Sequence, residues 1–207
     1  MRNVYVVTHA QSLHHIERRV GGWYDTSLTD LGREQAEKTG RFLKSAIDST
    51  DVQLFSSDLK RAAETAEIIG KHLQKPVTLD SRLREMSYGE AEGKPQSWFR
   101  DRIKPQSTDG NRLDHRVYKG AESRFEVADR VSAALTDILE RSALATVIVS
   151  HGFASTFLFM AWMKIPADHM VYCNLPTRPG SITKLHEDDL FGNRSVSYLC
   201  STAHLGD

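Results

Sequence analysis

Several features that often indicate a protein's class are scarce in this sequence of 207 residues. Its two cysteines, Cys173 and Cys200, lie far apart and match no metal-ligand spacing. Positive and negative side chains are balanced, with 27 Lys and Arg against 27 Asp and Glu, so the overall charge does not indicate binding to nucleic acid or to an anionic membrane. No apolar segment typical of a signal peptide follows Met1 and Arg2, and we therefore expect a cytoplasmic protein.

Long hydrophobic runs and linker segments are also lacking. The longest apolar stretch, at 153–163, is too short to span a bilayer and is typical of a buried helix, so we expect no membrane partner. The phenylalanines and methionines of 157–163 leave open whether this helix lies in the core or at the face of a homodimer. Because no segment rich in Pro, Gly and Ser divides the chain, we expect one domain over 1–207 with a lid insertion around 87–120.

Strand and helix patterns alternate along the chain. Apolar, β-branched segments typical of buried parallel strands lie at 3–8, 52–57, 76–80 and 145–151, and an edge hairpin is predicted over 180–200. Helical periodicity predicts helices over 27–47, 58–73, 122–142 and 152–163. Thr29 is the predicted N-cap of the first helix, and Asp58 lies at the predicted start of the second. The alternation predicts a three-layer α/β/α sandwich, a mainly parallel sheet with helices on both faces.

Three reactive side chains follow strands of this predicted sheet. His9 ends the first strand, Arg61 follows the second, and His151 ends a late one. Ligand sites of such sheets lie beyond the carboxyl ends of the strands, near helix N-termini. Taken singly, Arg61 has a structural interpretation as a partner of Glu64 or Asp58, and His151 has one as a helix cap satisfied by backbone. Together, two imidazoles and a guanidinium predict a pocket for a phosphate dianion.

A metal site at the same place is the main alternative for these residues. His9 and His151 could ligate zinc, but the charge of Arg61 would repel a cation. The sequence also contains no HxH, HExxH or CxxC spacing. We therefore predict no metal at this site.

A set of motifs surrounds these residues. Residues 8–12 read Thr-His-Ala-Gln-Ser, and further motifs follow in order: GGWYDTSLTDLGREQA (21–36), SSDLKRAAETA (56–66), LREMSYGEAEG (83–93), GAESRFEVADRV (120–131), VSHG (149–152) and STAHL (201–205). Together they resemble the histidine phosphatase superfamily, also called the phosphoglycerate mutase-like family, whose signature begins Arg-His-Gly-(Glu/Gln)-(Ser/Thr). The resemblance covers nearly the whole chain and implies the phosphoglycerate mutase-like fold.

The resemblance implies a phosphohistidine mechanism. His9 corresponds to the nucleophile, which attacks phosphorus in line and forms a phosphohistidine that water later hydrolyses. Glu85 corresponds to the proton donor for the leaving oxygen, which then activates water. Sequence alone, without the resemblance, favours an ion pair of Glu85 with Arg82 or Arg84.

The resemblance also implies which residues bind the phosphate. Arg61 and His151 correspond to positions that stabilise the equatorial oxygens in the transition state, so that His151 joins His9 and Glu85 as a predicted catalytic residue. The other predicted phosphate-binding residues, taken from the first motif and from VSHG, are Thr8, Gln11, Ser12, His15 and Gly152.

The first motif departs from the family pattern. Thr8 replaces the arginine, Ala10 replaces the glycine, and His15 stands where an asparagine often contacts the phosphate. Losing one preorganised donor costs on the order of 10²–10³ in rate, and a Cβ at position 10 restricts the backbone. Our hypothesis is that protonated His15, or Arg19, supplies part of the missing positive charge.

The family pattern implies a phosphatase acting on a small phosphorylated substrate. The short insertion and the STAHL ending resemble the smaller phosphatases, whereas GGWYD resembles the mutases. Hydrolysis needs neither a metal nor an organic cofactor, while a mutase would need a bisphosphorylated primer. The substitution at Thr8 leaves a second function open, that of a catalytically impaired protein that binds a phosphate ligand or acts in regulation.

The predicted lid is rich in basic and aromatic residues, and part of it, at 96–103, is predicted to be helical. The basic residues are Lys94, Arg100, Arg102, Lys104, Arg112, His115, Arg116 and Lys119, and the aromatic residues are Trp98, Phe99 and Tyr118. A basic lid favours a substrate with a second anionic group. Two alternatives stay open: stacking on a nucleotide or sugar, and a solvated loop with ion pairs to Asp101, Asp109 and Asp114.

Overall fold

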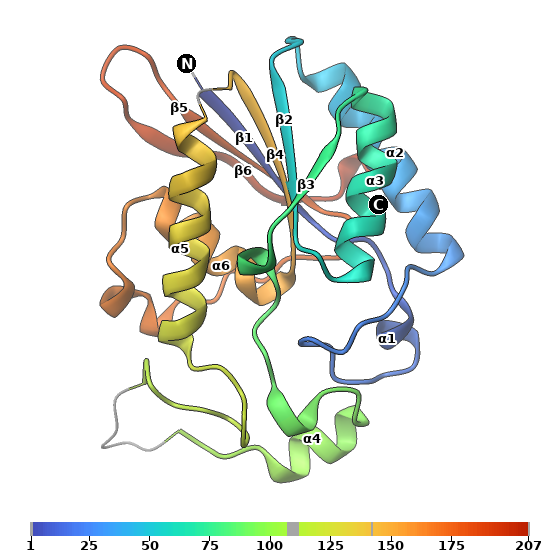
Figure 1. Ribbon diagram of the computed structural model, residues 1–207, viewed down its shortest axis with the longest axis vertical. Coiled ribbons are helices and arrows are strands. Elements are labelled where there is room, and N and C mark those ends of the chain that lie inside the picture. Colours follow the sequence, from blue (N-terminus) through green and yellow to red (C-terminus); the bar gives the residue numbers. More distant parts are fainter. Residues whose placement is uncertain (1, 107–111, 142, 207) are drawn as a thin grey trace.

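A six-stranded mixed sheet forms the centre of the computed structural model, which describes residues 2–106, 112–141 and 143–206 (Figure 1). Its strands are β1 (Arg2–Thr8), β2 (Val52–Ser56), β3 (Val77–Leu79), β4 (Ala145–Ser150), β5 (Ile182–Glu187) and β6 (Arg194–Ser201). In the order β3-β2-β4-β1-β5-β6 the first four strands are parallel, and β5 and β6 form an antiparallel hairpin at one edge. The predicted α/β fold with a mainly parallel sheet is confirmed.

Helices cover both faces of this sheet. They are α1 (Leu13–Ile16), α2 (Asp30–Ala46), α3 (Lys60–Leu73), α4 (Gln96–Arg102), α5 (Arg124–Glu140) and α6 (Gly152–Trp162), with short 3₁₀ turns at Ser81–Leu83, Gly89–Ala91, Ala167–Tyr172 and Ala203–Leu205. The pair α2 and α3 lies on one face and the pair α5 and α6 on the other (Figure 1). The strands run so that β1, β2 and β4 all end toward the side of α1 and α4.

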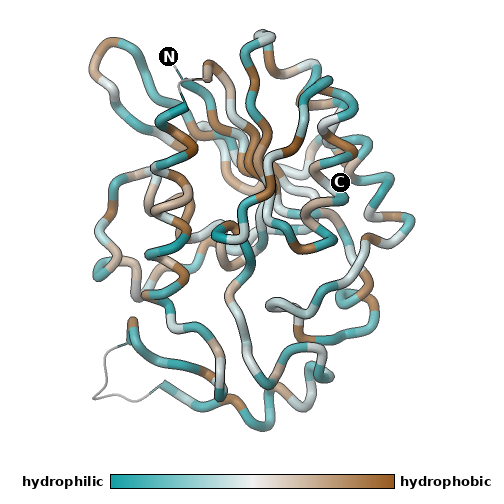
Figure 2. Tube along the Cα trace, in the orientation of Figure 1, coloured by the Kyte–Doolittle hydropathy of each residue, from teal (hydrophilic) through white to brown (hydrophobic). Residues whose placement is uncertain are grey.

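Figure 2 shows that the central strands are mostly hydrophobic along their length. Side chains of β1 alternate between the two layers, because successive residues of a strand point to opposite faces. Val4 and Val6 join the core beneath α5 and α6, while Tyr5 and Val7 join the core beneath α2 and α3. Burial on both faces explains why the sequence of this strand reads as a nearly continuous apolar run.

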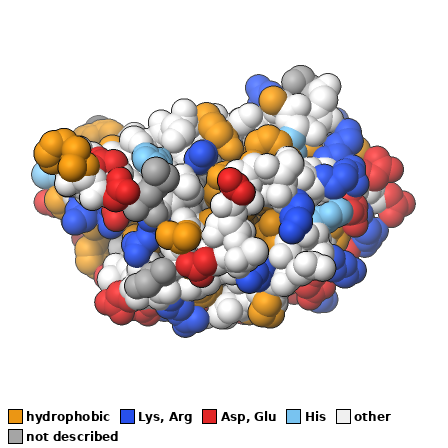
Figure 3. All heavy atoms as spheres, turned by 90° about the horizontal axis from the view of Figure 1, so that it is seen from above, with side chains coloured by type: hydrophobic (Ala, Val, Ile, Leu, Met, Phe, Trp, Pro, Cys, Tyr) orange, Lys and Arg blue, Asp and Glu red, His pale blue; other side chains and the backbone are white. Residues whose placement is uncertain are grey.

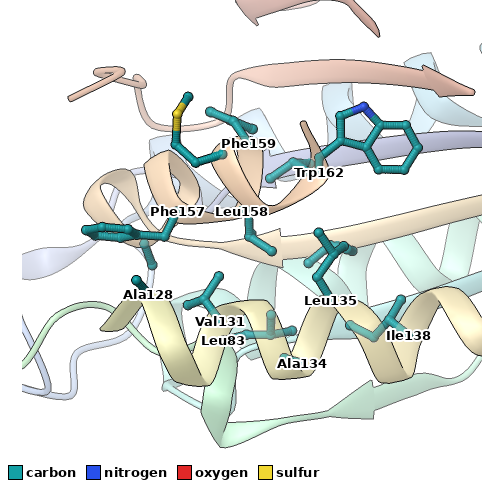
Figure 4. Packing of buried hydrophobic residues seen from close by; sticks show 14 of the residues in the cluster. Leu83, Ala128, Val131, Ala134, Leu135, Ile138, Phe157, Leu158, Phe159 and Trp162 are labelled. Carbon is teal, nitrogen blue, oxygen red and sulfur yellow. The ribbon is translucent and has the colours of Figure 1, made fainter. Parts of the chain in front are cut away.

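The larger core lies between the sheet, α5 and α6 (Figure 4). Phe157 and Trp162 of α6 are fully buried, and Val131 and Leu135 of α5 pack in the same cluster. The helix that could have formed a dimer face therefore lies in the core of this chain. Its position is fixed by apolar burial on all sides, which anchors the N-terminus of α6 near the carboxyl end of β4.

Most predicted helix starts agree with the structure. Thr29 caps α2, because its side chain accepts a hydrogen bond from the Gly32 N–H. Asp58 does not cap α3, since Leu59 is the N-cap residue and Asp58 instead forms an ion pair with Arg84, 2.6 Å between Oδ2 and Nη2. Residue 142, at the end of the predicted helix 122–142, lies outside the described residues.

The predicted lid is a packed segment in its described part. Helix α4 agrees with the helix predicted around 96–103, and Tyr118, Trp98 and Phe99 belong to a small separate cluster with Val20. Residues 107–111, and Asp109 with them, lie outside the described residues, so its predicted ion pair stays a prediction. Arg116 is paired with Glu126.

The end of the molecule opposite α1 and α4 shows no dominant charge. In Figure 3, which views that end, positive, negative and apolar side chains are interspersed. Within the described residues, none of the helices combines the length and apolar character needed to cross a membrane.

Candidate active site

A pocket of about 170 Å³ lies beyond the carboxyl ends of β1 and β4. It is lined by Thr8, His9, His14, His15, Gly21, Gly22, Arg61, Glu85, Tyr88, Gly152, Thr177 and Pro179. Six of the predicted site residues thus meet in one place, and His151 lies directly behind them, its ring 5.0 Å from that of His9. The pairing of Thr8 with Ser150 in the parallel ladder brings the two histidines together, because each follows its paired residue.

His9 is held as a neutral imidazole with one nitrogen left reactive. Its Nδ1 lies 2.8 Å from the Ala10 carbonyl oxygen, which can only accept, so Nδ1 carries the proton. Its Nε2 accepts a hydrogen bond from the Arg61 Nε–H at 3.2 Å. Burial, followed by the charge of Arg61 and the nearby His15, holds the pKa of His9 well below its ordinary value. The unprotonated Nε2 is the nitrogen that a nucleophile requires.

Arg61 is fixed by the GGWYD segment. It is almost fully buried, and its Nη2 and Nη1 donate to the carbonyl oxygens of Gly22 and Tyr24 at 2.7 and 3.0 Å. Gly22 has a positive φ of 57°, and a Cβ there would lie 2.9 Å from the Glu92 carboxylate, so this turn requires glycine. Burial lowers the pKa of Arg61 to about 10, which leaves it positively charged at neutral pH.

The structural interpretations of Arg61 and His151 are both wrong. Glu64 pairs with Arg33 and Asp58 pairs with Arg84, so neither contacts Arg61. His151 is the N-cap residue of α6 but makes no capping hydrogen bond.

His151 is fully buried and only half satisfied. Its Nε2 lies 2.8 Å from the Ser57 hydroxyl, and its Nδ1 has no hydrogen-bond partner among the described residues. Burial, with the charge of Arg61 next, lowers the pKa of His151 well below its ordinary value, so this ring is neutral. A buried ring nitrogen without a partner is costly, which makes His151 an unusual residue of this region.

Glu85 lies at the N-terminus of α6. Its Oε1 accepts from the N–H groups of Met86 and Ala154 at 2.8 and 3.0 Å, and its Oε2 accepts from Phe153 N–H at 3.0 Å. Oε2 has the fewer hydrogen bonds and is the oxygen better able to carry a proton. The indole N–H of Trp23 donates to the Glu85 carbonyl oxygen at 2.7 Å and fixes the backbone there.

Sequence reasoning without the family resemblance gave the wrong partner for Glu85. Arg82 instead pairs with Asp80 and Asp137, and Arg84 pairs with Asp58. The carboxylate is left to the backbone N–H groups at a helix N-terminus.

Thr8 occupies the position of the family's arginine and adds no charge. It is 5% exposed, and its hydroxyl donates to the Thr177 hydroxyl at 2.8 Å. Gln11 is predicted to bind phosphate but does not line the pocket, because its Oε1 accepts from the Thr29 hydroxyl at 2.8 Å. Ser12 does not line it either, and its hydroxyl lies 2.9 Å from His14 Nδ1.

His14 and His15 form the wall beside Thr8. Burial lowers the pKa of His14 to about 3 and that of His15 to about 4, with the charge of Arg61 adding to both. The ring of His15 stacks on His9 at 5.4 Å, and its Nδ1 accepts the Ser12 N–H at 3.1 Å. The low pKa disfavours the protonated His15 of the hypothesis, which stays a prediction.

Arg19 does not fill the place of the missing arginine. It lines a neighbouring cavity rather than this pocket, and its Nη1 donates to the Gly93 carbonyl oxygen at 2.7 Å. A metal site is not formed either: among the described residues, no three or more His, Cys, Asp and Glu side chains are arranged to hold an ion. The four imidazoles at the site face an arginine, which disfavours a cation.

Comparison with known proteins shows the family of this chain. The model of the histidine phosphatase superfamily (branch 1) matches residues 4–193. The chain belongs to the histidine phosphatase superfamily. The probable phosphoglycerate mutase GpmB of Salmonella paratyphi C (strain RKS4594) is 35% identical over 176 residues, which is 81% of this chain and 77% of that protein.

Solved structures of this superfamily share the fold. Bacillus stearothermophilus YhfR is 28% identical, with a TM-score of 0.79 over 99% of this chain and 100% of that one. A mycobacterial glucosyl-3-phosphoglycerate phosphatase is 23% identical, with a TM-score of 0.82 over 98% and 100% of the two chains. Of these similar proteins, one is named a probable mutase and another a phosphatase.

Sequence analysis missed several residues of this histidine phosphatase site. They are His14, Gly21, Gly22, Tyr88, Thr177 and Pro179. The GGWYD segment was noted only as a family resemblance, although its carbonyl groups hold Arg61. The adjacent pair His14 and His15 was the available signal, because it follows His9 closely in the sequence.

Proposed function

We propose that this protein is a phosphomonoester hydrolase that acts on a small phosphorylated substrate through a phosphohistidine on His9. The hydrogen bonds of His9 carry this proposal: Nδ1–H donates to the Ala10 carbonyl oxygen, and the unprotonated Nε2 is held by Arg61 beside the pocket. A neutral imidazole fixed in this tautomer has its lone pair on the nitrogen that must attack.

In the first step, the Arg61 Nε–H turns from Nε2 of His9 to a phosphoryl oxygen, and Nε2 attacks phosphorus while the bond to the leaving oxygen breaks. Glu85, protonated on Oε2, gives its proton to that oxygen. In the second step, Glu85 takes a proton from water, which attacks phosphorus and releases His9 and inorganic phosphate. Arg61 stabilises the phosphoryl oxygens: three of its five N–H groups have partners, and the other two have none among the described residues.

The charge of the pocket supports a second candidate function. Among the described residues that line it, Arg61 is the only Arg or Lys, while Thr8 is neutral and the lining histidines have lowered pKa values. A phosphate dianion gains less there than beside a second arginine. The alternative is a catalytically impaired protein that binds a phosphate ligand or acts in regulation. The curated relatives named as probable mutases support a third reading, in which His9 passes the phosphoryl group back to the product.

Phosphate release by the purified protein tests the proposal. The substrates would run from p-nitrophenyl phosphate to phosphoglycerates and sugar phosphates, without added metal. We expect turnover that falls on the order of 10³-fold or more in His9→Ala. His169→Ala is the matched control, because His169 is exposed and lies outside the pocket.

Each outcome selects one function. An acid-labile phosphoryl group trapped on the wild type, absent in His9→Ala, would support the covalent step. Turnover that survives in His9→Ala would contradict it. A folded protein that releases no phosphate from any ester would favour the binding function, and isomerised phosphoglycerate without net phosphate release would favour the mutase.

A further inference from the structure

The phosphate pocket adjoins a second cavity of about 330 Å³ on the side of Glu85. Tyr88 lines both cavities, Met86 follows Glu85, and Phe153 follows Gly152. The whole lining of this second cavity is Met86, Tyr88, Phe99, Ile103, Lys104, Pro105, Gln106, Arg112, His115, Val117, Arg124 and Phe153. We call it the lid cavity.

The lid cavity combines an apolar wall with positive charge. Tyr88 and Phe99 meet edge to face, with ring centroids 5.5 Å apart, and Phe153 packs in the same way on Phe157 at 5.2 Å. Lys104, Arg112, His115 and Arg124 supply basic groups, and none of the described residues in the lining is Asp or Glu. Such a cavity suits a group that is apolar or planar over most of its surface and negatively charged at one point.

Arg124 is the best placed of these cations. Its guanidinium stacks on the Phe153 ring, 4.9 Å from the centroid, and its Nη1 donates to the Cys173 carbonyl oxygen at 3.1 Å. No carboxylate among the described residues pairs with it. A guanidinium fixed by stacking and by one backbone acceptor keeps its remaining donors for a ligand.

Arg112 reinforces this positive charge. Its guanidinium lies over the Tyr172 ring, 4.7 Å from the centroid, and its buried Nε has no hydrogen-bond partner among the described residues. The charge of Arg112 lowers the pKa of Arg124 after burial does, which means that the two cations are close enough to repel each other. Two neighbouring arginines are favourable for an anion where no described residue of the lining is acidic.

We infer that the leaving group of the substrate occupies the lid cavity and bears a second anionic group, a carboxylate or a phosphate, bound by Arg124 with Arg112. The inference rests on the proposed function, because Glu85 can protonate the leaving oxygen only if the leaving group lies on its side of the pocket. The body of this leaving group is apolar or ring-shaped and packs against Tyr88 and Phe153.

Another cavity competes for the same anion. It has about 440 Å³ and is lined by His14, His15, Arg18, Arg19, Gly21, Gln96 and Arg100. This cavity joins the phosphate pocket through His14, His15 and Gly21, and it includes neither Glu85 nor Tyr88. A leaving group placed there would not adjoin the predicted proton donor, so we favour the lid cavity.

Matched aryl phosphates test the inference. The probes are 4-carboxyphenyl phosphate, its neutral isostere 4-carbamoylphenyl phosphate, and the bisphosphate of hydroquinone. We expect kcat/KM for at least one anionic probe to exceed that of the neutral probe by about 10-fold or more, as for a charge-assisted hydrogen bond. The comparison of the carboxylate with the bisphosphate shows which anion is preferred.

Variants locate the preference. Arg124→Gln and Arg112→Gln should bring the ratio close to 1, because kcat/KM for the anionic probe falls further than that for the neutral probe. Arg116→Gln is the control within the same segment, because Arg116 pairs with Glu126 and does not line the cavity. A ratio near 1 in the wild type, or a ratio unchanged in Arg124→Gln, overturns the inference. A ratio lost in Arg100→Gln and kept in Arg124→Gln assigns the anion to the other cavity and also overturns it.

A binding measurement separates this inference from the proposed function. If no ester is hydrolysed, the proposed hydrolase fails, and calorimetry with (4-carboxybenzyl)phosphonate and (4-carbamoylbenzyl)phosphonate tests the lid cavity without turnover. Tighter binding of the carboxylate by about 10-fold, lost in Arg124→Gln, supports the anion site. Equal affinities of the two phosphonates overturn it.

Discussion

The two halves of the phosphate pocket are built differently. On one side, His9, Arg61 and Glu85 are each fixed by hydrogen bonds to backbone groups. On the other side, Thr8 bonds to another hydroxyl, and His14 is neutral at physiological pH. The groups that would do chemistry are fixed in place, while the positive charge expected opposite them is missing. Positioning of the nucleophile and supply of charge are therefore separable properties of this fold.

The largest effect should come from restoring the charge. In Thr8→Arg, a guanidinium beside His9 would stabilise the phosphoryl oxygens in the transition state, and we expect kcat/KM for p-nitrophenyl phosphate to rise on the order of 10²-fold. Thr8→Val, which removes the hydroxyl without adding charge, should change it less than about 10-fold. Initial rates of phosphate release measure both.

A loss of activity in these variants would contradict the idea that the Thr8 side of the pocket only lacks charge. If Thr8→Arg and Thr8→Val both lose activity with unchanged melting temperatures, the hydroxyl pair of Thr8 and Thr177 is itself needed, and the pocket is built around threonine.

A smaller effect concerns stability in acid. His14 is buried, and its pKa falls from 6.5 to about 3 on folding, so the unfolded state binds more protons between these values. Stability is then fully present above pH 6.5 and is lost as the pH falls. For His14 alone the loss is about 2 kcal/mol between pH 7 and pH 5. Denaturant unfolding at both pH values should show this loss, and His14→Asn should reduce it.

His169→Asn is the control for this measurement, because His169 is exposed at the surface. If the free energy of unfolding falls equally between pH 7 and pH 5 in wild type and His14→Asn, the buried neutral His14 does not destabilise the fold in acid.

The smallest effect concerns anion binding. Sulfate stays a dianion from pH 5 to 7, so only the protein titrates in this range. In the pocket, sulfate would favour the protonated form of His15, whose pKa is about 4 without an anion. We expect the sulfate Kd to fall by about 3- to 10-fold from pH 7 to pH 5, because binding takes up a proton. Calorimetry should show a flatter dependence for His15→Asn. A flat profile in the wild type would exclude any supply of charge by this histidine.

The fold was readable from sequence because its signal is local. The apolar run of β1 and the apolar α6 result from burial on all sides, which leaves a mark in every few residues. The partner of Glu85 was not readable in this way. Its neighbour Arg84 is paired with Asp58, and Arg82 is paired with Asp137 as well as with the nearby Asp80. Only the tertiary structure brings Asp58 and Asp137 to these arginines.

The rest of the site depends on packing between distant segments. The lid cavity forms where Phe153 of α6 meets Arg124 of α5 and Phe99 of α4, and no sequence pattern reports such a meeting. His14 was missed because a histidine in a short turn gives no periodic signal. The motifs predicted the residues at the strand ends. The other residues that line the pocket became visible only in the structure.

Thr8 and Ser150 are directly paired in the ladder of β1 and β4, so the backbone fixes the spacing of the histidines that follow them. The lid contributes nothing to that spacing. Residues that line the lid cavity alone can therefore be substituted without changing that spacing. One sheet edge can serve a succession of substrates, each chosen by a different lid, and new specificity can arise without a period in which the catalytic groups must be rebuilt.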